Sequence, residues 1–246
     1  MTLKSFKRIV LDIETNGLLH QLIDFSKMPL KLKSEAKVWL IVLTNKDNPS
    51  EKIKLKLDEC TRDNLKECFK NTEEVIFHNG VSFDAIFLKL YGILEYRIFY
   101  HLDEKGNNGT LFNRPMKITD TLVLSRILNP DRYFGHSLDS WGRYLGEYKT
   151  DYRQVCIDAG HIAADSPKGH EFREYYPELD SYCEQDTVVT SKILDELITE
   201  RGRLAIDAAY HMELKICDIT LRQEYYGFGF NSDLAKHSVK DLTEKL

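Results

Sequence analysis

The sequence has no long apolar run, no regular cysteine spacing and no excess of basic residues. Its longest apolar runs, such as residues 38–43, are far too short to cross a bilayer, and no charged-then-apolar segment opens the chain. We therefore expect a cytoplasmic protein with no membrane partner. The five cysteines are odd in number, scattered and never spaced as C-x-x-C, which argues against a disulfide framework or a zinc site. A formal net charge of -5 is not typical of a general nucleic-acid binder, but it leaves room for a local basic groove.

Short motifs of several enzyme classes are also absent. The sequence contains no G-x-x-x-x-G-K-[ST], H-E-x-x-H or G-x-S-x-G motif, so nucleotide-hydrolysing loops, zincins and serine hydrolases have no support. Gly227-x-Gly229 lacks the third glycine and the preceding strand of a dinucleotide-binding fold. Neither a 20-to-50-residue repeat nor a low-complexity tract is visible.

The pattern of apolar residues predicts an α/β protein. With 246 residues, of which 42% are hydrophobic and 30% charged, the chain has the composition of an ordinary globular protein. Three strands precede the first long helix, and strand and helix then alternate, which is typical of a mixed sheet with helices on its faces. We expect a main domain over residues 1–202, a helical extension over residues 203–246, and a flexible loop at residues 103–113. Strands are predicted at residues 9–13, 38–43, 52–57, 75–77 and 116–118, and helices at residues 61–69, 82–90, 120–128, 137–145, 177 onwards, about 204–226, and 231–246.

Two acids stand at the exit of the first predicted strand. Positions two apart in a strand point to one face, so Asp12 and Glu14 present neighbouring carboxylates there. Two unpaired carboxylates that close repel each other unless a proton or a cation lies between them, and a divalent metal is the obvious cation. Taken alone, the pattern is more often plain loop chemistry than a metal site, so further acids are needed.

Two later segments supply such acids. Asp84 lies in the first turn of a helix after a strand, a position that the helix dipole also favours. Tyr182 and Asp186 are four residues apart on one helical face that is otherwise apolar, where an acid is costly unless it is paired or metal-bound. Asp120 is better explained as a helix cap.

These segments resemble a known family. Asp12-x-Glu14, Asn79 to Asp84, and Tyr182-x-x-x-Asp186 resemble the three exonuclease motifs of the DnaQ-like, or DEDD, superfamily of 3'-5' exonucleases, in its tyrosine subgroup. Residues 120–126 and 136–147 resemble the corresponding segments of family A DNA polymerases from short-tailed bacteriophages. Residues 226–231 resemble the passage that leads from the exonuclease domain to the polymerase domain. The resemblance covers residues 8 to about 232.

The resemblance implies a fold, a metal site and a substrate site. The fold is a ribonuclease H-like mixed five-stranded sheet flanked by helices. Asp12, Glu14, Asp84 and Asp186 are expected to hold two divalent cations, Mg²⁺ or Mn²⁺, about 3.5 to 4 Å apart, the spacing used for in-line phosphoryl displacement. Tyr182 is expected to orient the attacking water rather than to act as a base, because a phenol has an ordinary pKa of about 10.

The same resemblance implies contacts with a DNA 3' end. The residues expected to touch it are Thr15, Leu18 and Asn79, with Leu18 wedged between the last two bases. Leu18 could equally be a core residue. His78, Arg126 and His136 are weaker candidates, each as readily explained as a helix-end or surface residue.

The predicted function is a metal-dependent 3'-5' exonuclease that releases nucleoside monophosphates from single-stranded or frayed DNA 3' ends, as the proofreading part of a phage-type replicative polymerase. A phage-encoded protein would work in the host cell cytoplasm. A polymerase domain or subunit is expected to dock on the C-terminal helices, and no polymerase activity is expected of this chain, since nothing resembling palm, fingers or thumb follows residue 246. The alternatives are an RNA-trimming 3'-5' exoribonuclease of the same superfamily and a non-catalytic nucleic-acid-binding module.

Overall fold

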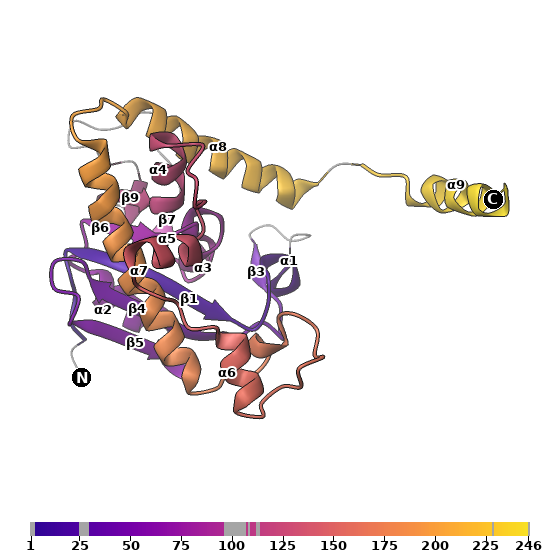
Figure 1. Cartoon of the computed structure of the whole chain (residues 1–246), viewed down its shortest axis with the longest axis horizontal. Helices are drawn as coiled ribbons and strands as arrows, with labels where there is room; N and C mark the ends of the chain where they lie inside the picture. Colours follow the sequence, from indigo (N-terminus) through magenta and orange to yellow (C-terminus); the bar gives the residue numbers. More distant parts are fainter. Residues whose placement is uncertain are drawn as a thin grey trace.

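One mixed sheet forms the centre of the structure, a computed structural model that describes residues 3–24, 30–95, 107, 109–111, 114–227 and 229–245. Its central strands are β1 (Arg8–Thr15), β4 (Val38–Asn45), β5 (Lys52–Lys56), β6 (Glu74–Phe77) and β9 (Arg114–Asp120). They lie in the order β5-β4-β1-β6-β9. β4 runs antiparallel to both neighbours, whereas β1, β6 and β9 are parallel. This arrangement confirms the predicted ribonuclease H-like α/β fold and its five strands (Figure 1).

Short strands add to this sheet. β8 (Gly109–Leu111) and β7 (Leu94–Glu95) extend it beyond β9, so that seven strands form one sheet in the described part of the chain. The flexible loop predicted at residues 103–113 lies mostly outside the described residues, and its described residues 109–111 are strand instead. β2 (Ile23–Asp24) and β3 (Lys31–Leu32) form a separate antiparallel pair after β1.

Helices cover both faces of the sheet. The predicted long helix after residue 177 is a single helix of 24 residues, whose buried side chains recur along one face. The helix over residues 152–158 was not predicted. The helices of the described residues are α1 (Leu19–Leu22), α2 (Arg62–Phe69), α3 (Asp84–Leu90), α4 (Thr121–Leu128), α5 (Leu138–Leu145), α6 (Tyr152–Asp158), α7 (Glu178–Arg201), α8 (Asp207–Tyr226) and α9 (Ser232–Lys245).

The alternation of side chains along β1 divides the core in two. Ile9, Leu11 and Ile13 belong to the larger hydrophobic cluster, which includes buried residues of α2 and α3. Val10 points the other way and packs with Trp141 of α5 and with buried residues of α4 and α7. The even-numbered positions of β1 therefore lie on the face that α7 covers, because successive side chains of a strand point to opposite faces.

The lysines of β5 contact acids of α7. Lys54 Nζ lies 2.7 Å from Glu184 Oε1, and Lys56 Nζ lies 2.8 Å from Asp180 Oδ2. Lys52 Nζ also lies 3.1 Å from Glu184 Oε2. The alternating lysines of this edge strand thus form ion pairs with the neighbouring helix. Their charges are not free to bind phosphate groups.

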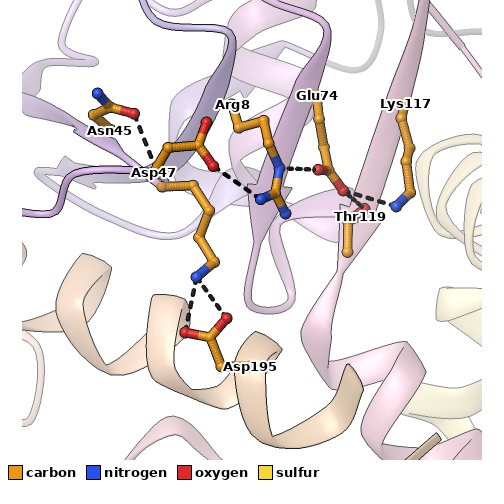
Figure 2. A network of polar contacts seen from close by, with 8 residues as sticks. Arg8, Asn45, Asp47, Glu74, Lys117, Thr119 and Asp195 are labelled. Atoms are coloured by element: carbon orange, nitrogen blue, oxygen red, sulfur yellow. Dashed lines mark hydrogen bonds and ion pairs between the residues drawn. The ribbon is translucent and has the colours of Figure 1, made fainter. Parts of the chain in front are cut away.

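A polar network joins neighbouring strands at the end of the sheet where β1 and β6 begin (Figure 2). Arg8 Nε donates to Glu74 Oε2 at 2.8 Å, and Lys117 Nζ lies 3.0 Å from Glu74 Oε1. Burial acts to raise the pKa of the Glu74 carboxyl, but Lys117, Thr119 and Arg8 together lower it below its ordinary value. Both oxygens of this buried carboxylate are therefore paired.

The last two helices differ in how they contact the domain. α8 packs against α4 and against the turn at residues 80–82, with Leu214 buried. α9 has no buried residue and stands apart from the rest of the molecule (Figure 1). The predicted division at residues 202 and 203 falls between α7 and α8 and stays a prediction. Within the described ranges, no helix is long and apolar enough to cross a membrane.

Candidate active site

Asp12 and Glu14 project from the last part of β1 towards α7. Both side chains are half-buried, and the pairing of β1 with β4 shifts register between Glu14 and Thr15, just after the second acid. Thr15 is buried, and its hydroxyl donates a hydrogen bond of 2.8 Å to the carbonyl of Gly17. The chain therefore turns sharply away from the sheet directly after the two carboxylates.

The turn before α3 is built to place Asp84. Asn79 has φ of 64°, and it is the non-glycine residue with positive φ among the described residues. At Gly80 an added Cβ would lie 2.3 Å from Cβ of Phe77, so a side chain cannot fit there. Asp84 follows as the first residue of α3, in the first helical turn as predicted, and it is buried.

Asp120 fastens this turn from the neighbouring strand. Its carboxylate accepts the backbone N–H of Asn79 at 2.9 Å and that of Val81 at 3.0 Å. It also accepts the N–H of Leu122 at 3.0 Å, which confirms the predicted capping of α4. One carboxylate thus caps a helix and holds the 79–82 turn in place, two tasks that sequence spacing alone did not connect.

α7 brings the last acid to the exit of β1. The helix packs along β1 and β4, with Cys183 and Asp186 on its buried side. The Cys183 thiol donates a hydrogen bond of 3.0 Å to Asp12 Oδ2. Ligand atoms of Asp12, Glu14 and Cys183 all lie within 4.8 Å of one another. The segments around residues 12 and 183, far apart in the chain, are therefore in contact.

The four acids lie close enough to affect one another's ionisation. Burial, followed by the charges of Asp12, Asp186 and Asp84, raises the pKa of Glu14 well above its ordinary value. Burial and then Asp12 likewise raise the pKa of Asp84 well above its ordinary value, and that of Asp186 to about 7. The pKa of Asp12 is also raised, by burial. Burial makes all four groups harder to ionise, and neighbouring acids add to this effect at Glu14, Asp84 and Asp186.

Two carboxylate oxygens in the cluster have no partner. Asp84 Oδ1 and Asp186 Oδ1 are buried and accept no hydrogen bond from any described residue. A buried polar atom without a partner costs about 1–3 kcal/mol, and more when it is charged. Hard carboxylate oxygens that converge and lack donors are the ligands that Mg²⁺ and Mn²⁺ prefer. The donor set therefore fits the predicted pair of cations.

Lys149 is a member of the site that the sequence analysis missed. Its ammonium lies 2.6 Å from Asp186 Oδ2 and 3.2 Å from the hydroxyl of Tyr182, and 4.7 Å from the centre of the Tyr182 ring. Gly142 lets the chain reach this position, because a Cβ there would lie 2.5 Å from the carbonyl oxygen of Glu147. The glycine signals after α5 were visible in the sequence, but nothing local indicated which element the following lysine would meet.

Cys183 was missed as well, although its spacing is informative. It lies four residues after Leu179 and three before Asp186, so all three share one face of α7. The sequence analysis treated the cysteines only as a group and looked for pairs among them. Helical spacing relative to Asp186 was the available signal.

The three residues expected to contact a 3' end differ in exposure. Leu18 is 61% exposed, so the alternative of a core residue is not what the structure has. Asn79 is exposed as well. Thr15 is only 5% exposed, and its hydroxyl is already bonded to Gly17. A substrate could meet Leu18 and Asn79 directly, whereas Thr15 shapes the turn that presents Leu18.

The two weaker histidine candidates, His78 and His136, make hydrogen bonds with residues of α4 beside the site. His78 Nδ1 lies 2.9 Å from the hydroxyl of Thr121, and burial together with the charge of Lys149 lowers the pKa of His78 to about 4. His78 is therefore neutral at physiological pH. His136 Nδ1 lies 2.8 Å from Ser125 Oγ, which ties the segment before α5 to α4.

Comparison with known proteins gives a partial match. No protein-family model matches the chain. It is 30% identical over 137 residues to the DNA-directed DNA polymerases of Escherichia phage T7 and of Enterobacteria phage T3, and each match covers 52% of this chain. The chain resembles a portion of a phage DNA polymerase. It spans 19%, about a fifth, of the length of these relatives.

Solved polymerase structures show a more distant likeness. The phi29 DNA polymerase complexed with single-stranded DNA is 15% identical, with a TM-score of 0.44, and the match covers 87% of this chain and 35% of that one. The family B DNA polymerase of the archaeon Pyrobaculum calidifontis is also 15% identical, with a TM-score of 0.46 over 85% of this chain and 27% of that one.

Proposed function

We propose that this chain is a metal-dependent 3'-5' exonuclease that releases nucleoside monophosphates from single-stranded or frayed DNA 3' ends. The observation that carries the proposal is a set of four carboxylates from β1, α3 and α7 that raise one another's pKa values, two of which keep a buried oxygen without a partner among the described residues. Such a cluster is unfavourable by itself, because four like charges share a poorly hydrated site. It becomes favourable when divalent cations bind.

In this proposal Asp12, Glu14, Asp84 and Asp186 hold two Mg²⁺ or Mn²⁺ ions. When bound, the ions supply activation of a water molecule and neutralisation of charge on the scissile phosphate and on the departing 3' oxygen. Asp12 is the acid whose charge raises the pKa of each of the other three carboxyls. It is therefore the residue that we assign to both ions.

Tyr182 and Lys149 have positioning roles in this proposal. Burial and the charge of Asp186 raise the pKa of Tyr182 above its ordinary value, so its hydroxyl keeps its proton and orients a water by hydrogen bonding. Lys149 donates to Asp186 and to the Tyr182 hydroxyl. Its ammonium holds both side chains in one arrangement and adds a positive charge beside the proposed position of the phosphate.

A DNA substrate is proposed because the sequence relatives are DNA polymerases. In this proposal Leu18, whose side chain is exposed, packs against the terminal base, and the exposed Asn79 lies beside the strand. Stacking of bases on apolar or aromatic side chains tolerates any sequence, which suits an enzyme that removes whichever nucleotide is last. Proofreading for a phage-type replicative polymerase is the role that fits this activity.

The helical extension at residues 203–246 is the proposed contact with a polymerase domain or subunit. Single exposed apolar residues are ordinary on protein surfaces, whereas a stripe of them on a helix marks a surface available for packing. The exposed apolar side chains are Met212, Ile216 and Ile219 on α8, and Leu234, Val239 and Leu242 on α9.

The test is release of labelled nucleotide from single-stranded DNA with added Mg²⁺. We expect activity that a chelator abolishes, and no activity in the double variant Asp12→Ala, Glu14→Ala. Asp186→Ala should lose nearly all activity, whereas Tyr182→Phe should keep part of it. A double variant as active as the wild type would show that the site is wrongly assigned. Faster cleavage of a matched RNA oligonucleotide would instead favour an exoribonuclease.

A further inference from the structure

A thiol lies inside the carboxylate cluster. Cys183 is fully buried, and its sulfur lies 3.0 Å from Asp12 Oδ2 and 3.7 Å from the Asp12 carbonyl oxygen. A carboxylate oxygen of Glu14 completes a set of three ligand atoms that lie within 4.8 Å of one another. Asp12 and Glu14 are half-buried, so an ion can approach from their side. A thiol is not a preferred ligand of Mg²⁺ or Mn²⁺, since both ions prefer oxygen ligands.

These distances suit a soft, tetrahedral ion. Zinc binds sulfur at about 2.3 Å and carboxylate oxygen at about 2.0–2.2 Å, so tetrahedral ligands lie roughly 3.5 Å apart. The Sγ–Oδ2 separation of 3.0 Å needs to open by only about half an ångström on that scale. The Glu14 oxygen, within 4.8 Å of both other atoms, supplies the third position.

We propose that Asp12, Glu14 and Cys183 bind a thiophilic divalent cation of the Zn²⁺ and Cd²⁺ class, in competition with the Mg²⁺ or Mn²⁺ ions of the proposed nuclease site. The inference rests on that proposed function only in sharing Asp12 and Glu14 with it. On binding, the S–H bond of Cys183 breaks, its proton passes to solvent, and the sulfur lone pair forms the bond to the metal. No oxidant or reductant takes part.

A second observation points to an ion at this place. Asp186 is 5% exposed, and its Oδ1 atom has no hydrogen-bond partner among the described residues. Asp186 lies one turn from Cys183 on the buried face of α7. Its charge raises the pKa of Glu14, and the charge of Asp12 raises the pKa of Asp186. Asp186 is therefore a neighbour of the three ligands whose free oxygen a bound ion would satisfy.

A simpler role for Cys183 is that its S–H only positions Asp12. The two roles separate by substitution, because Cys183→Ser keeps a donor of similar size and removes the soft ligand. Cys183→Ala removes both. Cys217→Ser is the matched control, since Cys217 lies on α8 and is the one free cysteine, among the described residues, that is not buried.

The experiment is titration of the chelator-treated full chain with Co²⁺, followed by near-ultraviolet absorption and by calorimetry, with circular dichroism to check folding. We expect a sulfur-to-cobalt charge-transfer band in the wild type and in Cys217→Ser, and none in Cys183→Ser or Cys183→Ala. We also expect Cd²⁺ to bind Cys183→Ser roughly tenfold more weakly or worse.

The outcomes separate this inference from the proposed function. Calorimetric binding of Co²⁺ by the wild type without a charge-transfer band would overturn the role of Cys183 and leave the carboxylate site standing. A band that persists in Cys183→Ser would also overturn it. Absence of any divalent-ion binding would overturn both proposals. If Cys183→Ser does not fold, the comparison of Cys183→Ala with Cys217→Ser decides in the same way.

Discussion

Replacing Asp12 by Asn should make the metal-free protein more stable. After burial, the charge of Asp12 is the largest cause of the raised pKa values of Glu14, Asp84 and Asp186. Asn keeps the shape of the side chain and can still accept the hydrogen bond from Cys183. The substitution therefore removes repulsion and leaves the packing in place.

The size of the effect follows from Asp186. Its pKa of about 7, against an ordinary value of 3.8, corresponds to about 4 kcal/mol at roughly 1.4 kcal/mol per unit. Burial is the larger cause, so we assign only part of this amount to Asp12, and the relief at Glu14 and Asp84 adds to it. We expect Asp12→Asn to gain about 2 kcal/mol in chelator at pH 8, or about 4–8 °C in Tm.

The sign of the pH dependence is fixed by the raised pKa values. A folded protein whose carboxyls hold protons more tightly than those of the unfolded chain loses stability as pH rises between the two pKa values. For Asp186 this window runs from about pH 4 to about pH 7. Metal-free wild type should thus lose stability across the window, and Asp12→Asn should lose less.

Urea unfolding with chelator and with Mg²⁺ is the assay. A ligand at 100 times its Kd stabilises the folded state by about 2.7 kcal/mol, so saturating Mg²⁺ should stabilise the wild type and cancel the advantage of Asp12→Asn. Asp165→Asn, at an exposed loop position, should change neither condition by more than about 0.5 kcal/mol. If Asp12→Asn is less stable than the wild type in chelator at pH 8, the reasoning about repulsion is refuted.

Three further predictions concern single residues. Lys149→Met should move the pKa of Asp186 above about 7, because it removes an ammonium 2.6 Å from the carboxylate. The pH range over which the metal-free protein loses stability should then extend to higher pH in urea unfolding. Leu18→Ala should change stability by less than about 0.5 kcal/mol yet slow nucleotide release; a stability loss with unchanged release would make Leu18 a packing residue. Gly80→Ala should cost about 1–3 kcal/mol in urea unfolding, since its Cβ meets a buried phenylalanine side chain at 2.3 Å, whereas Gly229→Ala, with nothing near its Cβ, should cost far less.

Much of the fold was predictable because its signals are local. The alternation in β5 and the helical spacing in α7 are both visible within a few residues, and each element forms close to where it was expected. Short elements such as α6 and β8 escaped prediction, since seven or three residues hold too little periodicity to stand out. Their formation depends on the partners against which they pack.

The sequence by itself determined the face of β1 on which Asp12 and Glu14 lie, the place of Asp84 in the first turn of a helix and the helical face that carries Asp186, because strand and helix periods fix side-chain directions. Only the tertiary structure decided that Lys149 and Cys183 join them. Those contacts arise where a turn after α5 and the packing of α7 on β1 bring together segments that are distant in the chain, and no local period encodes the distance between two elements.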